Sequence, residues 1–287
     1  MHSFVLRSIL LAAFVMPAAA QPQAWAWDDG TVPYVQTPTE IVERMMRMAE
    51  VQPGDFVIDL GSGDGRLVIA AAKRGARGVG VDLDPSLVQL ATRNAQAAGV
   101  GDRARFEVRD IFETDLSRAT VVTMYLLPDF NAKLEPRLLA LKPGTRIVSH
   151  DGGIGNWPPD ETLEMRTPEK PVGVGGNSKV ELFIVPADVR GTWNSQVPQH
   201  GGQWRFEIAQ RYQMLEIEAR TGGRDLLVRN SRLRGEEVKL AITGIVRDHA
   251  WHHYFVGRVR GDTIEGEVTV SDGNKRMVYP WLAKRAR

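Results

Sequence analysis

The chain of 287 residues lacks cysteine entirely. Disulfide bonds, thiolate metal sites and cysteine nucleophiles are therefore excluded, and the folded state depends on its core for stability. An excess of charge of either sign is also absent, since the net charge is +1 at pH 7. Bulk electrostatics thus give no reason to expect a nucleic-acid partner. The length suits one large or two ordinary domains, and with 43% hydrophobic and 25% charged residues the chain can bury a normal core.

The first apolar run of the chain is too short to span a bilayer comfortably. Arg7 precedes this run, which covers residues 9–16, and Pro-Ala-Ala-Ala follows it. The order is typical of a secretory signal peptide, whereas an N-terminal core helix would show a polar face. We predict a signal peptide over residues 1–20 with cleavage near Ala20, a linker over residues 21–31, and a periplasmic or secreted mature chain without a transmembrane span. If the signal prediction fails, the chain would be cytoplasmic.

A strand-type apolar run over residues 56–60 leads into a glycine turn, and a helical apolar pattern begins at Leu67. The glycines occupy alternate positions, Gly61, Gly63 and Gly65. Strand, glycine turn and helix together bring a ligand against bare backbone at a helix N-terminus. The dinucleotide fingerprint would place its third glycine at position 66, where this chain has Arg66. The turn therefore predicts a nucleotide-like ligand, and Arg66 disfavours NAD.

Acidic residues stand at the carboxyl ends of three successive predicted strands. Asp59 ends the first strand, Asp82 the second and Asp110 the third. A carboxylate at the end of the second strand can accept hydrogen bonds from both ribose hydroxyls of a nucleotide. The alternative role is helix capping, for which Asp84 is better placed than Asp82 because a helix starts near Pro85. The series of acids strengthens the prediction of a nucleotide-like ligand.

The pattern D-x-G-x-G-x-G over residues 59–65 resembles the first motif of class I S-adenosylmethionine-dependent methyltransferases. The resemblance implies S-adenosyl-L-methionine as cofactor, with Asp82 on the ribose and Asp110 beside the adenine. Asp59 would lie near the methionine portion. Tyr34, in an extended segment before the sheet, would close over the cofactor, and plain packing is the alternative role for it. In full, the implied cofactor-binding residues are Tyr34, Asp59, Gly61, Ser62, Gly63, Gly65, Asp82, Leu83, Asp110 and Ile111.

Residues 32–151 are similar to a narrower group, the small protein-lysine N-methyltransferases, mitochondrial ones among them. The shared features are Val-Pro-Tyr-Val from Val32, Gly-Ser-Gly-Asp-Gly-Arg from Gly61 and Ala-Ala-Lys in the following helix. The resemblance implies an enzyme that N-methylates a protein lysine by in-line transfer, and it covers under half of the chain. Two alternatives stay open, a small-molecule methyltransferase and an exported protein that binds an adenosyl ligand without turnover.

The methyl acceptor is expected at the end of the fourth strand, where residues 125–129 read Tyr-Leu-Leu-Pro-Asp. Methyltransferases that act on amide or base nitrogens usually carry Asn/Asp-Pro-Pro-Tyr/Phe there, so the departure argues against a nucleic-acid base as acceptor. The catalytic residue is left unassigned, with Tyr125, His150 and Asp151 as candidates and Trp157 as a further candidate for the pocket wall. His150 and Asp151 also suit purely structural roles at a strand end.

Strands alternating with helices over residues 32–188 predict a doubly wound, Rossmann-like, mostly parallel seven-stranded sheet, the S-adenosylmethionine-binding domain. Short alternating runs separated by glycine turns follow, and they predict an all-β antiparallel barrel or meander over residues 189–287. A ligand-holding barrel, a docking module and a dimer surface are its possible roles. Within this region, residues 248–253 read Asp-His-Ala-Trp-His-His. A zinc or copper site is the less favoured interpretation, and we predict a polar connection without metal.

Overall fold

The computed structural model describes residues 34–170, 176–197, 202–246 and 249–286. The predicted signal peptide and linker, residues 1–20 and 21–31, lie outside the described residues and stay predictions. Within these ranges, no helix combines the length and the apolar character that crossing a membrane requires.

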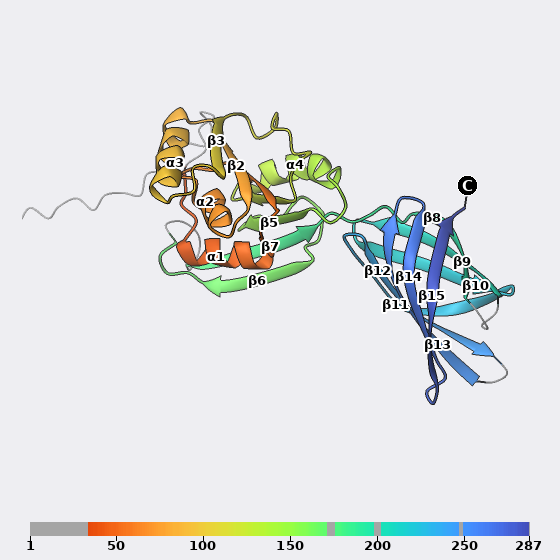
Figure 1. The fold of residues 1–287 in the computed structure, drawn as a ribbon. Helices are drawn as coiled ribbons and strands as arrows, with labels where there is room; N and C mark the ends of the chain where they lie inside the picture. The colour runs from red at the N-terminus through yellow and green to blue at the C-terminus, as the bar shows by residue number, and fades with distance from the viewer. Residues whose placement is uncertain (1–33, 171–175, 198–201, 247–248, 287) are drawn as a thin grey trace, which may run out of the picture. The chain divides into compact units, whose positions relative to one another are not determined.

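Strands and helices alternate through the first part of the chain (Figure 1). The helices are α1 (Thr39–Met48), α2 (Arg66–Lys73), α3 (Pro85–Ala97) and α4 (Pro128–Leu139). The strands are β1 (Phe56–Leu60), β2 (Arg77–Asp82), β3 (Ala104–Val108), β4 (Val121–Met124), β5 (Arg146–His150), β6 (Glu161–Arg166) and β7 (Asn177–Ile184). They form one seven-stranded sheet in the order β3-β2-β1-β4-β5-β7-β6.

Strands β1 to β5 run parallel, and β7 pairs antiparallel with both β5 and β6. The predicted doubly wound, mostly parallel sheet is therefore confirmed. Strand order reverses at β1, which pairs with β2 on one side and with β4 on the other. In open sheets of this kind, ligands bind beyond the carboxyl ends of the strands at the point of reversal.

The two faces of the sheet bury different side chains because residues alternate along each strand. Val57, Val121 and Val148 face α1 and α2, in a cluster with Ile41 and Met45 of α1. The intervening residues on β1, β4 and β5 face the other way and form a second cluster that includes Leu134 and Leu138 of α4. This alternation decides which side chains stand on which side of the carboxyl edge.

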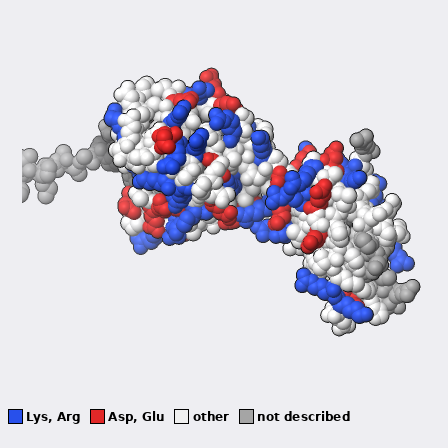
Figure 2. Space-filling model, viewed as in Figure 1, with Lys and Arg blue, Asp and Glu red and all other residues white. Residues whose placement is uncertain are grey.

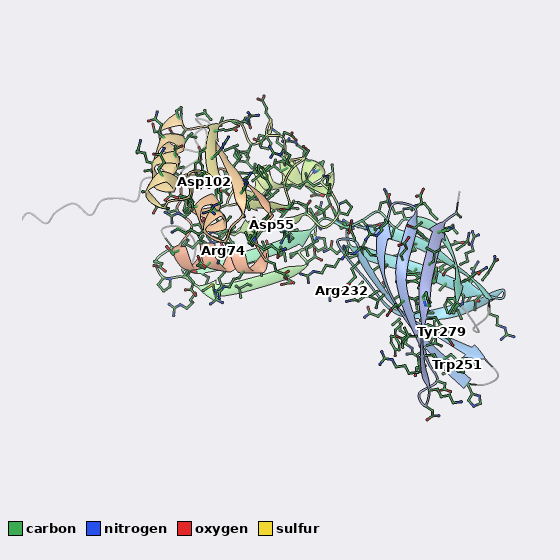
Figure 3. All side chains as sticks on the ribbon, in the orientation of Figure 1. Asp55, Arg74, Asp102, Arg232, Trp251 and Tyr279 are labelled. Atoms are coloured by element: carbon green, nitrogen blue, oxygen red, sulfur yellow. The ribbon has the colours of Figure 1, made fainter. Side chains whose placement is uncertain are left out.

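A polar network joins the amino ends of three strands around Asp55, which is labelled in Figure 3. The Asp55 carboxylate accepts hydrogen bonds from Thr120 Oγ1 at 2.7 Å and from the backbone N–H of Gln52 at 2.9 Å. It also pairs with the guanidinium of Arg146, which donates to the carbonyl oxygen of Ala49 at 2.7 Å. Every member lies on the edge opposite the predicted ligand site, so the network supports the sheet.

The second part of the chain forms a closed antiparallel barrel of eight strands. They are β8 (Gly191–Val197), β9 (Gly202–Arg211), β10 (Met214–Thr221), β11 (Arg224–Arg234), β12 (Glu237–Val246), β13 (His249–Arg260), β14 (Thr263–Ser271) and β15 (Arg276–Arg285). The predicted all-β region is thus confirmed as a barrel. Trp193, Ser195 and Val197 alternate inward in strand β8.

Aromatic side chains fill the barrel, with Trp193, Trp204, Trp281, Phe206 and Phe255 all fully buried. His253 lies among them, with its ring centroid 4.7 Å from that of Trp204. A small barrel filled in this way is a packed core. Among the described residues, no group of three or more metal-binding side chains gathers into a metal site.

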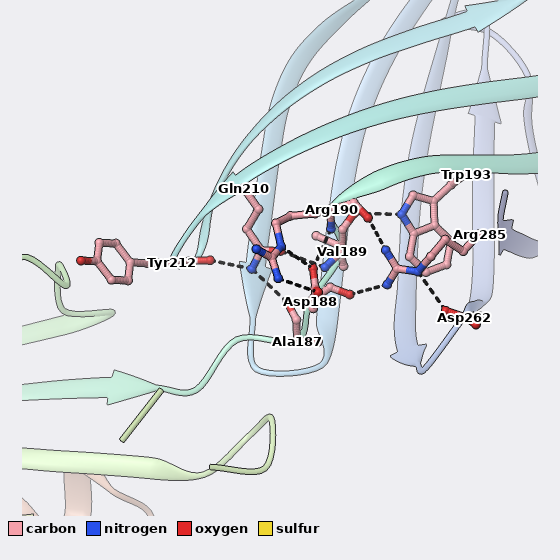
Figure 4. Close-up of polar contacts among 9 residues, drawn as sticks. All are labelled: Ala187, Asp188, Val189, Arg190, Trp193, Gln210, Tyr212, Asp262 and Arg285. Carbon is pink, nitrogen blue, oxygen red and sulfur yellow. Dashed lines mark hydrogen bonds and ion pairs between the residues drawn. The ribbon is translucent and has the colours of Figure 1, made fainter. Parts of the chain in front are cut away.

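Arg285 closes the seam between β15 and β8, the last and first strands of the barrel, where the backbone register covers three residue pairs (Figure 4). Its Nε donates to Asp262 Oδ1 at 2.9 Å and its Nη2 to the carbonyl oxygen of Asp188 at 2.8 Å. The guanidinium also lies 4.4 Å from the ring centroid of Trp193. One side chain therefore supports a seam in which only three residues of β8 pair with β15.

The visible surface carries Lys and Arg interspersed with Asp and Glu (Figure 2). Positive charge on that face is not gathered into one continuous stripe. This mixing agrees with the near-zero net charge of the sequence.

Candidate active site

The glycine turn between β1 and α2 has left-handed backbone at each glycine, with φ of 76° at Gly61, 51° at Gly63 and 83° at Gly65. Its amide groups are engaged within the protein. The N–H groups of Gly61 and Ser62 both donate to the carbonyl oxygen of Val81, at 3.0 and 2.9 Å. The N–H of Gly65 donates to the carbonyl oxygen of Ser62 at 2.8 Å. The turn is therefore fixed by its own bonds, and contact of a ligand with its bare backbone stays a prediction.

Two members of this turn are held by packing. A Cβ on Gly65 would lie 2.6 Å from Phe106 Cζ and 2.9 Å from Ala91 Cβ. A Cβ on Gly80 of β2 would lie 2.5 Å from Ser62 Cβ, so the Ser62 side chain packs beneath the turn against β2. Gly65 thus brings α2 close to β3 and α3, and Ser62 is 5% exposed. Gly65 and Ser62 therefore contribute to a ligand site by setting the shape of the turn.

Asp82 and Asp84 divide the two roles that the sequence left open. Asp84 Oδ1 accepts from the backbone N–H of Ser86 at 2.7 Å and caps α3. Asp82 Oδ2 accepts from the N–H of Gly63 at 2.9 Å, and its Oδ1 accepts from the N–H of Asp84 at 3.0 Å. A carboxylate offers about four acceptor positions. Asp82 therefore joins β2 to the glycine turn and keeps acceptor capacity for ribose hydroxyls.

An apolar group stands beside this carboxylate at the ends of β2 and β3. Leu83 is 67% exposed and Val108 is 54% exposed. Val108 pairs with Asp82 in the strand register. Val108 is not among the cofactor-binding residues predicted from the sequence. Ile111, further along the chain, is buried. Exposed apolar side chains at a strand end suit the flat face of an adenine.

The loop after β3 is shaped by two sets of hydrogen bonds. Asp110 Oδ1 accepts from the N–H of Phe112 at 2.7 Å, which closes a local turn. Arg137 of α4 donates to the carbonyl oxygens of Ile111 at 3.2 Å, Phe112 at 2.5 Å and Thr114 at 2.5 Å. Arg137 thus fixes the loop that carries Asp110 and Ile111. No pattern in the sequence predicts this role.

Asp59 is buried at the end of β1, 1% exposed, and accepts a hydrogen bond from Thr123 Oγ1 of β4 at 2.6 Å. Burial raises the pKa of Asp59 to about 7, and the neighbouring charges of Asp82 and Asp64 act in the same direction. The bond from Thr123 opposes that rise. Because the pKa of this carboxyl lies near neutral pH, a nearby cation strongly changes its ionisation. Thr123 is a polar residue inside an apolar strand, a signal that the sequence did offer.

Arg66 connects the turn to the segment before α1. It donates to Asp64 through Nε at 2.8 Å and Nη2 at 2.5 Å, and its Nη1 donates to the carbonyl oxygen of Thr37 at 2.5 Å. The glycine turn is therefore bound to the segment that directly follows Val-Pro-Tyr-Val. Tyr34 is 39% exposed, and its role over the cofactor stays a prediction.

The three candidate catalytic residues lie together beyond β4 and β5. The rings of Tyr125 and His150 have centroids 4.1 Å apart, and His150 Nε2 lies 3.3 Å from Asp151 Oδ2. Burial lowers the pKa of His150 to about 4, so the imidazole is neutral. Burial, the Asp151 charge and a hydrogen bond to Asp151 raise the pKa of Tyr125 to about 12. The cluster is thus one carboxylate with two neutral rings.

Two residues outside the sequence prediction complete this cluster. Ser178 Oγ of β7 lies 3.0 Å from His150 Nε2. Lys170, from the loop after β6, forms an ion pair with Asp151 Oδ2. No spacing signal in the sequence indicates either contact, because the β6–β7 hairpin folds back beside β5. Trp157 is instead part of the core, 2% exposed with its ring centroid 5.3 Å from that of Phe183, so its assignment to a pocket wall is wrong.

The chain is similar in sequence to known methyltransferases. Residues 59–161 match the family model described as ANTKMT methyltransferase domain. A protein-lysine N-methyltransferase of Saccharolobus islandicus is 45% identical over 137 residues, which is 47% of this chain and 85% of that protein. The chain belongs to this methyltransferase family. The adenine nucleotide translocase lysine N-methyltransferase of Mus musculus is 37% identical over 45% of this chain, which spans 56% of that relative.

A solved structure is also similar to this methyltransferase. It is titled as an RNA methyltransferase from Salinibacter ruber in complex with S-adenosyl-L-homocysteine, with 46% sequence identity and a TM-score of 0.48. The similarity covers 54% of this chain and 96% of that chain. The barrel lies beyond the family-model match, which ends at residue 161.

S-adenosylmethionine is the cofactor of this methyltransferase. The residues fit it: Asp82 keeps acceptor capacity for ribose hydroxyls, and Leu83 and Val108 offer exposed apolar surface beside it. Because this cofactor has no phosphate, a turn whose amides are engaged internally is compatible with it. Bound S-adenosylmethionine supplies an activated methyl group together with its leaving group.

Proposed function

We propose that this enzyme N-methylates a lysine side chain of a protein. The observation that carries the proposal is the 45% identity to a protein-lysine N-methyltransferase over 85% of that relative's length. The mouse relative, also a lysine N-methyltransferase, supports the same acceptor class. The chain's departure from Asn/Asp-Pro-Pro-Tyr/Phe at residues 125–129 argues in the same direction.

The acceptor cluster, defined as Tyr125, His150, Asp151, Ser178 and Lys170, contains a carboxylate that suits lysine methylation. A lysine nitrogen attacks as a neutral amine and becomes positively charged as it gains the methyl group. The Asp151 carboxylate stabilises such a developing charge, and a fixed carboxylate in a partly buried position does so without reorganising. The neutral His150 ring adds no positive charge, so the competing cation at Asp151 is the Lys170 ammonium that pairs with it. The cluster therefore favours an amine acceptor over an acidic or phosphorylated one.

The test is transfer of a tritiated methyl group from S-adenosylmethionine into a cell extract. We expect label in the protein fraction, and we expect acid hydrolysis of that fraction to release methylated lysine. Asp82→Ala should abolish labelling because the variant removes both the ribose acceptor and the bond to Gly63. Asp102→Ala, which removes the same charge from an exposed side chain, is the matched control and should label normally.

Label recovered in small molecules or in RNA, and absent from protein, would contradict the lysine proposal while leaving the methyltransferase assignment intact. Measuring cofactor affinity by calorimetry for wild type and Asp82→Ala in parallel separates a loss of cofactor binding from a loss of acceptor binding.

We further propose that the mature enzyme is exported to the periplasm or secreted. The basic start, short apolar run and Ala-rich end of residues 1–20 support this proposal. N-terminal sequencing of the mature chain after cell fractionation is the test, and we expect a start near residue 21 in the exported fraction. An intact Met1 in the cytoplasmic fraction would contradict it. Export would also limit the acceptor to proteins of that compartment.

A further inference from the structure

The acceptor cluster contains a lysine of the chain itself. The ammonium group of Lys170 pairs with Asp151 Oδ2 and donates to the carbonyl oxygen of Asn177 at 2.6 Å. Its side chain is 6% exposed, compared with 21% for Asp151. Lysine is seldom buried to this extent unless a partner holds it. The cluster therefore provides a buried site that fits a lysine head group.

The carboxylate of this site is fixed independently of the lysine. The backbone N–H of Lys179 donates to Asp151 Oδ1 at 2.9 Å, and the N–H of Asp151 donates to the carbonyl oxygen of Lys179 at 2.8 Å. Asp151 has left-handed backbone with φ of 54°, which turns the chain at the end of β5. Oδ2 is left to face the lysine and His150 Nε2, and the Tyr125 side chain hydrogen-bonds to the same carboxylate. The acceptor oxygen is thus positioned before any ligand binds.

The site adjoins the cofactor turn. Tyr125 directly follows β4, and the next residue, Leu126, places Cδ2 3.0 Å from the position that a Cβ on Gly61 would take. Tyr125 also stands two residues beyond Thr123, the partner of Asp59, and its ring centroid lies 4.1 Å from that of His150 at the end of β5. An amine held at Asp151 therefore lies on the acceptor side of the cofactor site.

We propose that Lys170 is an internal occupant of the acceptor-lysine site and that an acceptor lysine binds by replacing it at Asp151. The proposal rests on the proposed function of lysine methylation and adds how the enzyme recognises its acceptor. Replacement exchanges one ammonium group for another, so the partly buried carboxylate is not left unpaired, which would be costly. The bound acceptor then loses a proton to solvent and attacks as the neutral amine. The consequence is a reduced apparent affinity for the acceptor, since binding competes with the internal lysine.

The test measures binding of a single amine probe to the full chain. Nα-acetyl-lysine N-methylamide is titrated by calorimetry into wild type, Lys170→Ala, Lys170→Gln and the double variant Lys170→Ala/Asp151→Asn. We expect both single variants to bind the probe at least about 10-fold more tightly than wild type, because the competitor is gone. The double variant should lose binding, and the norleucine analogue, which lacks the amine, should not bind any variant.

Lys142→Ala is the matched control, since this lysine is exposed just beyond α4, and it should bind the probe as wild type does. Thermal denaturation shows whether each variant is folded, and Lys170→Gln keeps a polar side chain should Lys170→Ala unfold. Equal probe affinity in wild type and both Lys170 variants would overturn the proposal and leave the ion pair as a support for the β6–β7 loop. Calorimetry with S-adenosylmethionine runs in parallel, so failure of the methyltransferase function appears there and not in the probe titration.

Discussion

Asp59 is a buried side chain whose ionisation should be coupled to cofactor binding. Its carboxyl is enclosed between β1 and β4, and burial raises its pKa to about 7 while Thr123 donates a hydrogen bond to it. Asp64 and Asp82 are the other charged groups that act on it. A carboxyl in this state is half ionised near neutral pH, so a cation placed beside it shifts its charge.

We predict that cofactor affinity rises with pH through about 7. The methionine portion of S-adenosylmethionine carries positive charge, which lowers the pKa of Asp59 in the complex, so binding releases a proton and is favoured at higher pH. The expected gain between pH 6 and pH 8 is about 10-fold. Calorimetry at both values measures it. Asp59→Asn provides the reference, since any pH dependence that it retains belongs to other groups, and an equal slope in both proteins would refute the assignment.

Each glycine of the turn between β1 and α2 has its own structural reason. Gly65 is required by the approach of Phe106 and Ala91, and Gly61 and Gly63 by left-handed backbone. The glycine motif can be recognised in the sequence, but the structural reason for each glycine cannot be predicted from it. Packing partners that come from β3 and α3 are set by tertiary structure alone.

At the scale of elements, the Asp55 network ties the amino ends of β1, β4 and β5 together. Asp55 is buried and its partner Arg146 is 16% exposed. Removing one member leaves a largely buried guanidinium without its carboxylate. Exposed pairs behave differently, since solvent screens them.

We predict that Asp55→Ala lowers the free energy of unfolding by about 3 kcal/mol, the usual cost of breaking a buried ion pair. Urea denaturation followed by circular dichroism measures the change. Asp102→Ala is the control, because Asp102 is 74% exposed at 4.0 Å from Arg103 and should change stability by less than about 1 kcal/mol. The two carboxylates are labelled in Figure 3. Similar losses in both variants would show that the network does not act as a buried unit.

The barrel, at the scale of the whole molecule, depends on a contact between segments almost a hundred residues apart. Arg285 near the end of the chain holds Asp188, Asp262 and the ring of Trp193 (Figure 4). The adjoining β15–β8 seam has three residue pairs in register, whereas β13 and β14 share nine. The seam therefore has much less backbone hydrogen bonding than the β13–β14 pair.

We predict that Arg285→Ala destabilises the barrel by about 2 kcal/mol, through the loss of charge-assisted hydrogen bonds and of the contact with Trp193. Tryptophan fluorescence during guanidinium denaturation is the measurement, because three fully buried tryptophans lie in the barrel. Arg220→Ala removes an arginine that is 50% exposed on β10 and should have little effect. A midpoint unchanged by Arg285→Ala would mean that backbone pairing alone closes the barrel.

Local patterns were enough to predict the seven-stranded sheet, the glycine turn and the all-β region, because strand alternation and helical spacing are local properties of the chain. The division between Asp82 and Asp84 was also predictable, since a cap is recognised by its distance from a helix start. The barrel hairpins at Gly235 and Gly261 repeat one turn pattern and were visible in the sequence for the same reason.

Periodicity along the chain was enough to predict the architecture, and the resemblance of one contiguous motif to a known family implied the cofactor class. Tertiary structure alone decided the internal use of the turn amides, the clamp of Arg137 on the loop after β3 and the meeting of Lys170 with Asp151. Each of these contacts joins residues from separate elements. Their distance in sequence carries no information about their distance in space, because chain reversal and strand order place them together.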